Sequence, residues 1–79
     1  MSQIPYCDST GRLSVEVHLS YAADVFLVDR INFQRYQSGQ DFDYFGGHYS
    51  KTPVTISVVG SGRWYLIVVG GGHYKYRFY

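Results

Sequence analysis

The chain is short of cysteine, of net charge and of long apolar runs. Cys7 is the only cysteine among the 79 residues, so no internal disulfide can stabilise the domain. Seven basic residues against six acidic residues give a formal net charge of +1, and the basic residues are scattered along the chain. General nucleic-acid binding and membrane-surface binding need a clustered basic excess, so we expect neither of them here.

No run of about eighteen apolar residues is present, and the N-terminus has neither a basic start nor an apolar stretch. We therefore expect a cytoplasmic protein. A single domain of this length supplies only about 3–5 kcal/mol of net stability. Nine tyrosines, five phenylalanines and one tryptophan offset the small core, because each buries ~150–250 Å². Formation of a homo-oligomer is the other common way in which so small a domain gains stability.

What the chain does have is apolar side chains at every second position, which is the period of a β-strand. Leu13 to Leu19 and Val54 to Val58 are two such runs. The pattern predicts strands over 12–20, 25–28, 54–59, 63–69 and 73–79, with a weaker one over 41–45. Strands at this spacing indicate an all-β fold, a six- to seven-stranded antiparallel β-sandwich or barrel. Residues 1–11 have no period and are expected to be an arm, leaving 12–79 as the single domain.

Glycines separate most of these runs. Gly60-Ser61-Gly62 is typical of a short hairpin connection, Gly46-Gly47 of a turn or bulge, and Gly70-Gly71-Gly72 of a turn. Residues 33–38 predict one short helical turn, with Asn32 as its N-cap and Gly39 closing its end. So short a helix is not stable alone, so Phe33 or Tyr36 must dock on the sheet.

Two further expectations concern pairing and burial. We expect 12–20 and 73–79 to be antiparallel neighbours, with Glu16 opposite Lys75 or Arg77. The predicted core consists of Val15, Val17, Val25, Leu27, Ile56, Val58, Leu66 and either Trp64 or Tyr65.

The motifs of catalysis and metal binding are weak in this sequence. The histidines and Cys7 lack the close spacing of zinc ligands, and Ser61 lies outside a nucleophile-elbow motif. The glycine-rich stretches lie between predicted strands, whereas a phosphate-binding loop needs a following helix. Asp41 and Asp43 share one face of a strand, which is more simply a solvated face than a glycosidase pair. We therefore expect no catalytic residue, no metal and no cofactor.

Two loop segments combine amides, cations and aromatic rings, the residue types that bind small polar or anionic ligands. The candidate ligand-binding residues are Asn32, Gln34, Arg35, Tyr36, His48, Tyr49 and Lys51. Amides supply hydrogen bonds, tyrosines a stacking face, and Arg35 with Lys51 the charge for an anionic group. The alternative is that these aromatic residues only cover the end of the core.

The same segments carry a resemblance to a known family. The strings VFLVDRINFQRYQSG (25–39), YFGGH (44–48), KTP (51–53) and SGRWY (61–65) follow one another as they do in the small bacterial family called domain of unknown function 1883. The resemblance covers about residues 13–69. It implies a compact β-sandwich with no established activity. Some relatives are joined to TIR domains, which implies a sensing or interaction role.

From these observations we expect a binding or protein-interaction module without catalytic activity, whose partner is a small ligand or a protein. A sensing domain for a small polar or anionic ligand is one form of it. Two alternatives stay open, a structural or oligomer-forming protein and a small hydrolase or nuclease. The latter would need His48 close to Asp41 or Asp43.

Overall fold

A computed structural model describes residues 4–70 and 72–79. The elements are β1 (Tyr6–Leu19), β2 (Ala23–Asp29), α1 (Arg30–Gln37), β3 (Phe45–Tyr49), β4 (Val54–Gly70) and β5 (Tyr74–Phe78). All five strands form one antiparallel sheet in the order β3-β2-β4-β1-β5. The all-β class is confirmed, with five strands in place of the six or seven expected.

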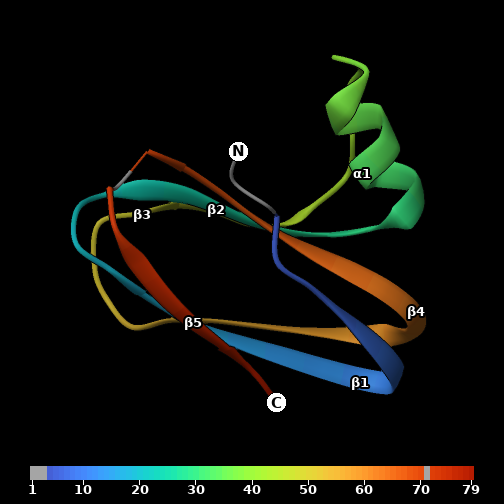
Figure 1. Cartoon of the computed structure of the whole chain (residues 1–79), viewed down its shortest axis with the longest axis horizontal. Helices are drawn as coiled ribbons and strands as arrows, with labels where there is room; N and C mark the ends of the chain where they lie inside the picture. Colours follow the sequence, from blue (N-terminus) through green and yellow to red (C-terminus); the bar gives the residue numbers. More distant parts are fainter. Residues whose placement is uncertain (1–3, 71) are drawn as a thin grey trace.

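Two long strands, β1 and β4, form the centre of the sheet and bend together. Their register pairs Gly11 with Gly60 and Ser9 with Gly62, and Figure 1 shows both ribbons turning sharply at the same end of the molecule. Gly62 has a φ of 118°, which L side chains rarely adopt. The bend lets the two halves of β4 face each other: the first half pairs with β1, and the second also pairs with β2.

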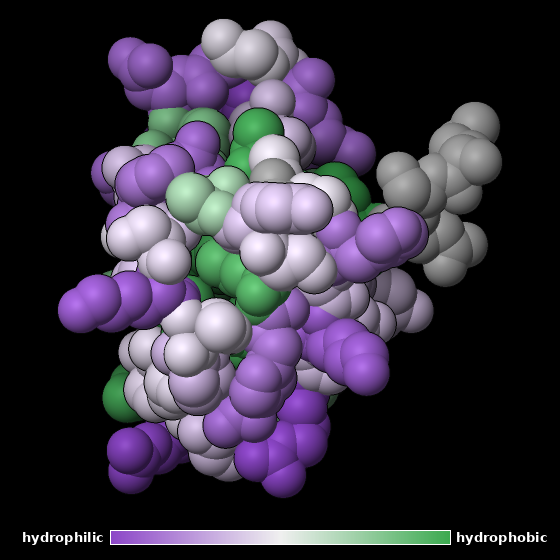
Figure 2. Space-filling model, turned by 90° about the vertical axis from the view of Figure 1, so that its left-hand side faces the viewer, coloured by the Kyte–Doolittle hydropathy of each residue, from purple (hydrophilic) through white to green (hydrophobic). Residues whose placement is uncertain are grey.

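The core lies inside this bend. Its buried side chains come from β1, β2 and both halves of β4, at alternate positions of each strand: Leu13, Val15, Val17, Val25, Leu27, Val54, Ile56, Val58, Trp64 and Leu66. Every predicted core residue is buried, and Trp64, not Tyr65, faces inward. At the left-hand end of Figure 1, seen face-on in Figure 2, an apolar surface lies at the centre and is ringed by hydrophilic residues.

The helix is confirmed but begins earlier than the sequence suggested. Asp29, and not Asn32, is the N-cap: its Oδ1 accepts from the backbone N–H of Asn32 at 2.9 Å. Gly39 follows the helix with a φ of 74°, as expected of a closing glycine. Phe33 docks on the sheet by stacking on Tyr65, with ring centroids 3.9 Å apart and planes at 8°.

Four local expectations differ from the structure. Residues 60–62 continue β4 through the bend and are not a hairpin connection, while residues 6–11 of the expected arm pair with β4 as the start of β1. Residues 41–44 form no strand, and Gly46-Gly47 lies inside β3 in unbroken register with β2, not in a turn or bulge. Residues 1–3 of the arm, and Gly71 of the expected 70–72 turn, lie outside the described residues.

The pairing of β1 with β5 is confirmed. The two strands are antiparallel neighbours, and Glu16 is opposite Arg77. A guanidinium nitrogen of Arg77 lies 3.7 Å from Glu16 Oε1. Because both side chains are solvated, the pair contributes only about 0.2–1 kcal/mol.

Leu66→Ala should lower the free energy of unfolding by about 2–5 kcal/mol, because Leu66 is 1% exposed and its loss leaves a cavity in the core. Val69→Ala, on the same strand at 46% exposure, should change it by less than about 0.5 kcal/mol. Urea unfolding followed by tryptophan fluorescence measures both. Equal midpoints for the two variants would contradict the assigned inner face of β4.

Gly46→Ala should destabilise the domain by more than about 1 kcal/mol, since the new Cβ would lie 2.0 Å from the carbonyl oxygen of Val25. Gly46 also has a φ of 132°, which alanine rarely adopts. Gly11→Ala is the matched control, because its Cβ would meet nothing within 4 Å. A melting temperature of Gly46→Ala as high as that of the control would refute this close approach of β3 to β2.

Candidate functional site

The seven residues proposed from sequence lie in two groups at opposite ends of β2. Asn32, Gln34, Arg35 and Tyr36 are on α1, which follows Asp29. His48 and Tyr49 pair with Asp24 and Ala23, at the other end of that strand, and Lys51 follows them. Asp24 and Asp29 are five residues apart, roughly 16 Å in an extended strand. Figure 1 shows α1 and the far end of β3 on opposite sides of the molecule.

Two members of the helical group hold the structure together. Asn32 Nδ2 donates to Asp29 Oδ1, and Asn32 Oδ1 accepts from the backbone N–H of Asp43, both at 2.9 Å. Tyr36 packs edge-on against Phe42, at 5.4 Å between centroids. Gln34 and Arg35 line an open depression of about 230 Å³, and Tyr36 lines a separate one of about 340 Å³ together with residues of β4.

The second group is similarly divided. His48 Nδ1 lies 2.9 Å from Asp24 Oδ1, and both side chains are exposed. The carboxylate that His48 meets is therefore on β2 and is neither Asp41 nor Asp43. Tyr49 packs against the core, and Lys51 is exposed in the turn before β4. The packing of Tyr49 supports the alternative in which these rings cover the core, whereas the ring of Tyr36 contacts Phe33 and Phe42.

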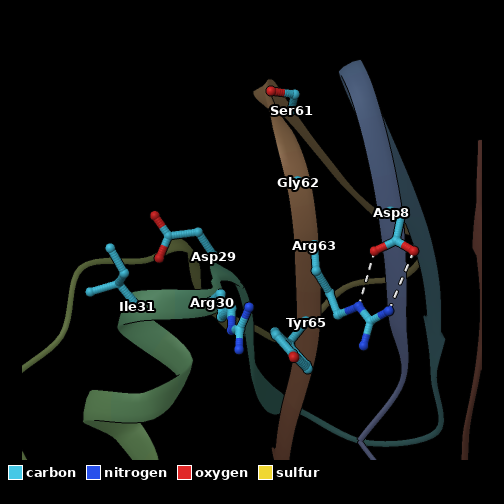
Figure 3. Close-up of a pocket in the computed structure, with 8 residues that line it drawn as sticks. All are labelled: Asp8, Asp29, Arg30, Ile31, Ser61, Gly62, Arg63 and Tyr65. Atoms are coloured by element: carbon cyan, nitrogen blue, oxygen red, sulfur yellow. Dashed lines mark hydrogen bonds and ion pairs between the residues drawn. The ribbon is translucent and has the colours of Figure 1, made fainter.

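A larger cavity, of about 550 Å³, lies between the start of α1 and the bend of β4. Two arginines and two aspartates dominate its lining, which consists of Asp8, Asp29, Arg30, Ile31, Ser61, Gly62, Arg63 and Tyr65. Figure 3 shows Arg30 and Arg63 on either side of Tyr65, with Arg63 turned toward Asp8. Segments from β1, the end of β2, α1 and β4 therefore meet at one polar site.

Arg63 is held in a fixed position within this cavity. Its Nε and Nη2 donate to the two carboxylate oxygens of Asp8 at 3.0 and 3.5 Å, and its guanidinium lies 4.3 Å from the centroid of the Tyr6 ring. The hydrogen bond from Arg63 lowers the pKa of Asp8, and the same bond raises the pKa of Arg63. Both groups are thus ionised at neutral pH and neutralise each other.

Arg30 has no such partner. Within residues 4–70 and 72–79, its guanidinium makes no hydrogen bond and no ion pair. Asp29, next to it, is occupied on Oδ1 by the backbone and side-chain N–H groups of Asn32. Arg30 therefore offers an exposed, uncompensated planar cation at the mouth of the cavity, beside a second cation whose position is fixed.

The described residues contain no group of three or more histidine, cysteine or acidic side chains arranged to hold a metal ion. In the part of the chain that the structure covers, no helix has the length and hydrophobicity needed to cross a membrane.

Comparison with protein families gives one match. The family model described as domain of unknown function (DUF1883) matches residues 10–77. The chain belongs to this family. The match confirms the resemblance seen in the sequence and extends it into β5 of this DUF1883 domain. Comparisons with curated proteins and with solved structures found no match.

Sequence reasoning missed the cavity for an identifiable reason. A hairpin at residues 60–62 would place Ser61 and Arg63 at an exposed tip, away from the end of β2. A helix starting after Asn32 would leave Arg30 in a loop. The available signal was the pair Asp29-Arg30 directly after a buried strand, because polar residues at a strand end often mark a site.

Asp29→Ala should lower the free energy of unfolding by about 1 kcal/mol, because the variant loses the N-cap of α1. Asp41→Ala, which removes an exposed aspartate outside the helix, is the control and should change stability by less than about 0.5 kcal/mol. Urea denaturation curves of both variants provide the test. Indistinguishable curves would mean that Asp29 does not cap the helix.

Proposed function

We propose that this domain is a non-catalytic binding module whose cavity at the start of α1 takes a small ligand with one anionic group, a carboxylate or a phosphate. The observation that carries this proposal is that two arginines line the same cavity: Arg30, which has no ion-pair partner among the described residues, and Arg63, which is hydrogen-bonded to Asp8. The ligand would act as a signal or an effector and would leave chemically unchanged.

The guanidinium of Arg30 presents parallel N–H groups that match two oxygens of a carboxylate or phosphate. Arg63 keeps N–H groups beyond the two that Asp8 accepts, since a guanidinium has five. Ser61 adds a hydroxyl to the lining, and a Cβ at Gly62 would meet nothing within 4 Å, so the wall is open there. These groups together support recognition of an anion and leave space for the body of the ligand.

Size and charge restrict the ligand further. A volume of about 550 Å³ is within the ~300–1,000 Å³ typical of small-molecule sites. Asp8 and Asp29 also line the cavity, so a multiply charged anion would meet carboxylates as well as cations. A singly charged or zwitterionic ligand fits this balance best, in agreement with the small excess of basic residues in the whole chain.

A structural or oligomer-forming role is the second candidate. The packing of Asn32, Tyr36 and Tyr49 favours it, because these residues of the expected site stabilise the fold. Sedimentation equilibrium across a hundredfold range of concentration distinguishes the two candidates. A monomer that binds ligand supports the module, whereas a stable oligomer that binds none supports the structural role.

Arg30→Ala should weaken binding of the anionic ligand by about tenfold or more, because a hydrogen bond to a charged group contributes ~1.5–3 kcal/mol. The ligand is first found by thermal-shift screening of simple carboxylates, amino acids and phosphate monoesters, and its affinity is then measured by isothermal titration. Arg12→Ala, an exposed arginine of β1 that does not line the cavity, is the matched control and should bind normally.

The double variant Arg35→Ala with Lys51→Ala separates this cavity from the site proposed from sequence. Normal affinity in the double variant and weak affinity in Arg30→Ala would locate the ligand at the start of α1. The reverse result would locate it at the residues first proposed. If no compound of the screen shifts the melting temperature at millimolar concentration, the binding function itself is refuted.

A further inference from the structure

The last strand, β5, is an open edge of the sheet. β5 pairs with β1 on one side, and no strand among the described residues pairs with its other side. Ser14 and Tyr79 exchange both backbone hydrogen bonds, at 2.8 and 2.9 Å. In an antiparallel ladder this fixes the odd-numbered residues of β5 as the ones bonded to β1. The backbone N–H and C=O groups of Tyr74, Tyr76 and Phe78 therefore point outward, ready to accept another strand.

The two faces of this edge differ in chemistry. Lys75 and Arg77 are on one face, and the only carboxylate opposite β5 in the pairing register is Glu16. Glu16 is shared, because its Oε1 lies 3.7 Å from Arg77 and 3.1 Å from His18 Nε2. Lys75 is opposite His18 and so faces no acid across the strands. This face of the edge carries excess positive charge.

The other face of β5 is aromatic. Tyr74, Tyr76 and Phe78 follow one another with centroids 6.2 and 5.7 Å apart. Tyr74 and Phe78 pack against the core, while Tyr76 between them is 47% exposed. Where β5 begins, a cavity of about 510 Å³ lies between the ends of β1 and β5, lined by His18, His73 and Lys75 among others. An added strand would find both an apolar row and a pocket that contains the cation of Lys75.

We propose that β5 binds an extended acidic segment of a partner protein, which adds to the sheet as a sixth strand. In such a strand acidic side chains alternate with apolar ones. The acidic side chains would lie opposite Lys75 and Arg77, and the apolar ones would extend the aromatic row. The backbone of Tyr74, Tyr76 and Phe78 would supply the hydrogen bonds that give affinity independent of sequence.

The same charges disfavour a second copy of this chain as the occupant. A two-fold symmetric antiparallel pair must align residues of the same parity. Lys75 would therefore face Arg77 or Lys75 of the other copy, or Arg77 would face Arg77. Like charges directly opposite one another are destabilising, and lysine on an edge strand is a common protection against self-pairing. Nucleic acid would use the cations but would leave the outward backbone groups unpaired.

The test uses fluorescent peptides whose core alternates valine with glutamate, and it measures their binding to the full chain by anisotropy at low salt. The glutamate peptide should bind, and the same peptide with lysine in place of glutamate should bind at least about fivefold more weakly. N-methylation of the peptide residues whose N–H groups would bond to β5 should abolish binding. N-methylation of the alternate residues, whose N–H groups point away from β5, should preserve it. Equal effects of the two N-methylation patterns would overturn strand addition.

Lys75→Glu is the matching variant of the protein. It should reduce affinity for the glutamate peptide about fivefold and raise affinity for the lysine peptide, while Arg12→Glu, at an exposed arginine of β1 outside the register with β5, should change neither. Unchanged preference in Lys75→Glu would refute the proposal. The proposal would also be refuted if an oligothymidylate competed with the peptide for the same site, which would indicate nucleic acid. A dimer of the chain that the peptide dissociates would refute it too, because it would indicate a second copy as the occupant. None of these measurements involves the cavity at α1, so either proposal can fail without the other.

Discussion

The fold depends on the way Trp64 closes the bend in β4. Its indole Nε1 donates to the carbonyl oxygen of Gly60 at 3.1 Å, so the side chain satisfies a backbone group where the strand turns. A Cβ at Gly60 would lie 3.3 Å from the Trp64 ring, which is tighter than most such contacts. A glycine at 60 and an indole at 64 are thus needed together. With the bend closed, Ile56 and Val58 share one core with Leu66.

The same bend explains where the cavity lies. The register that pairs Asp8 with Arg63 is the continuation of β1 and β4 beyond Gly11 and Gly60. The aromatic rings then attach α1 to the outer face of the sheet: Tyr6 lies next to Tyr65, and Tyr65 stacks on Phe33 of the helix. The start of α1 is thereby held opposite Arg63. Such stacked and tilted pairs each add about 0.5–1.5 kcal/mol beyond burial, a substantial share for a domain of this size.

The alternation of apolar residues predicted most of the strands, the core and the neighbours β1 and β5, because these follow from local pattern and from which faces are apolar. The pattern could not distinguish a hairpin from a bend at Gly60-Ser61-Gly62, since both require glycine. The distinction depends on Gly11, 49 residues away in sequence, which pairs with Gly60. Residues 6–10 carry no apolar period, and their strand is imposed by pairing with β4. Gly46 was expected in a turn or bulge, although the reason for glycine is the nearby carbonyl of Val25.

The candidate site was harder to predict than the fold, for a related physical reason. Residue types that bind ligands also make contacts that stabilise a small fold: Asn32 links the helix to the following segment, and Tyr36 contacts Phe42. A binding residue differs from these only in having no partner within the chain, which a sequence does not reveal. Among the described residues Arg30 meets that criterion in a cavity, and the outward backbone of Tyr74, Tyr76 and Phe78 meets it along an edge. Both features offer hydrogen-bonding capacity that no described residue uses. Arg30 begins a helix that docks on the sheet through Phe33, and β5 is paired with β1, so binding at either place would require little further ordering of the backbone.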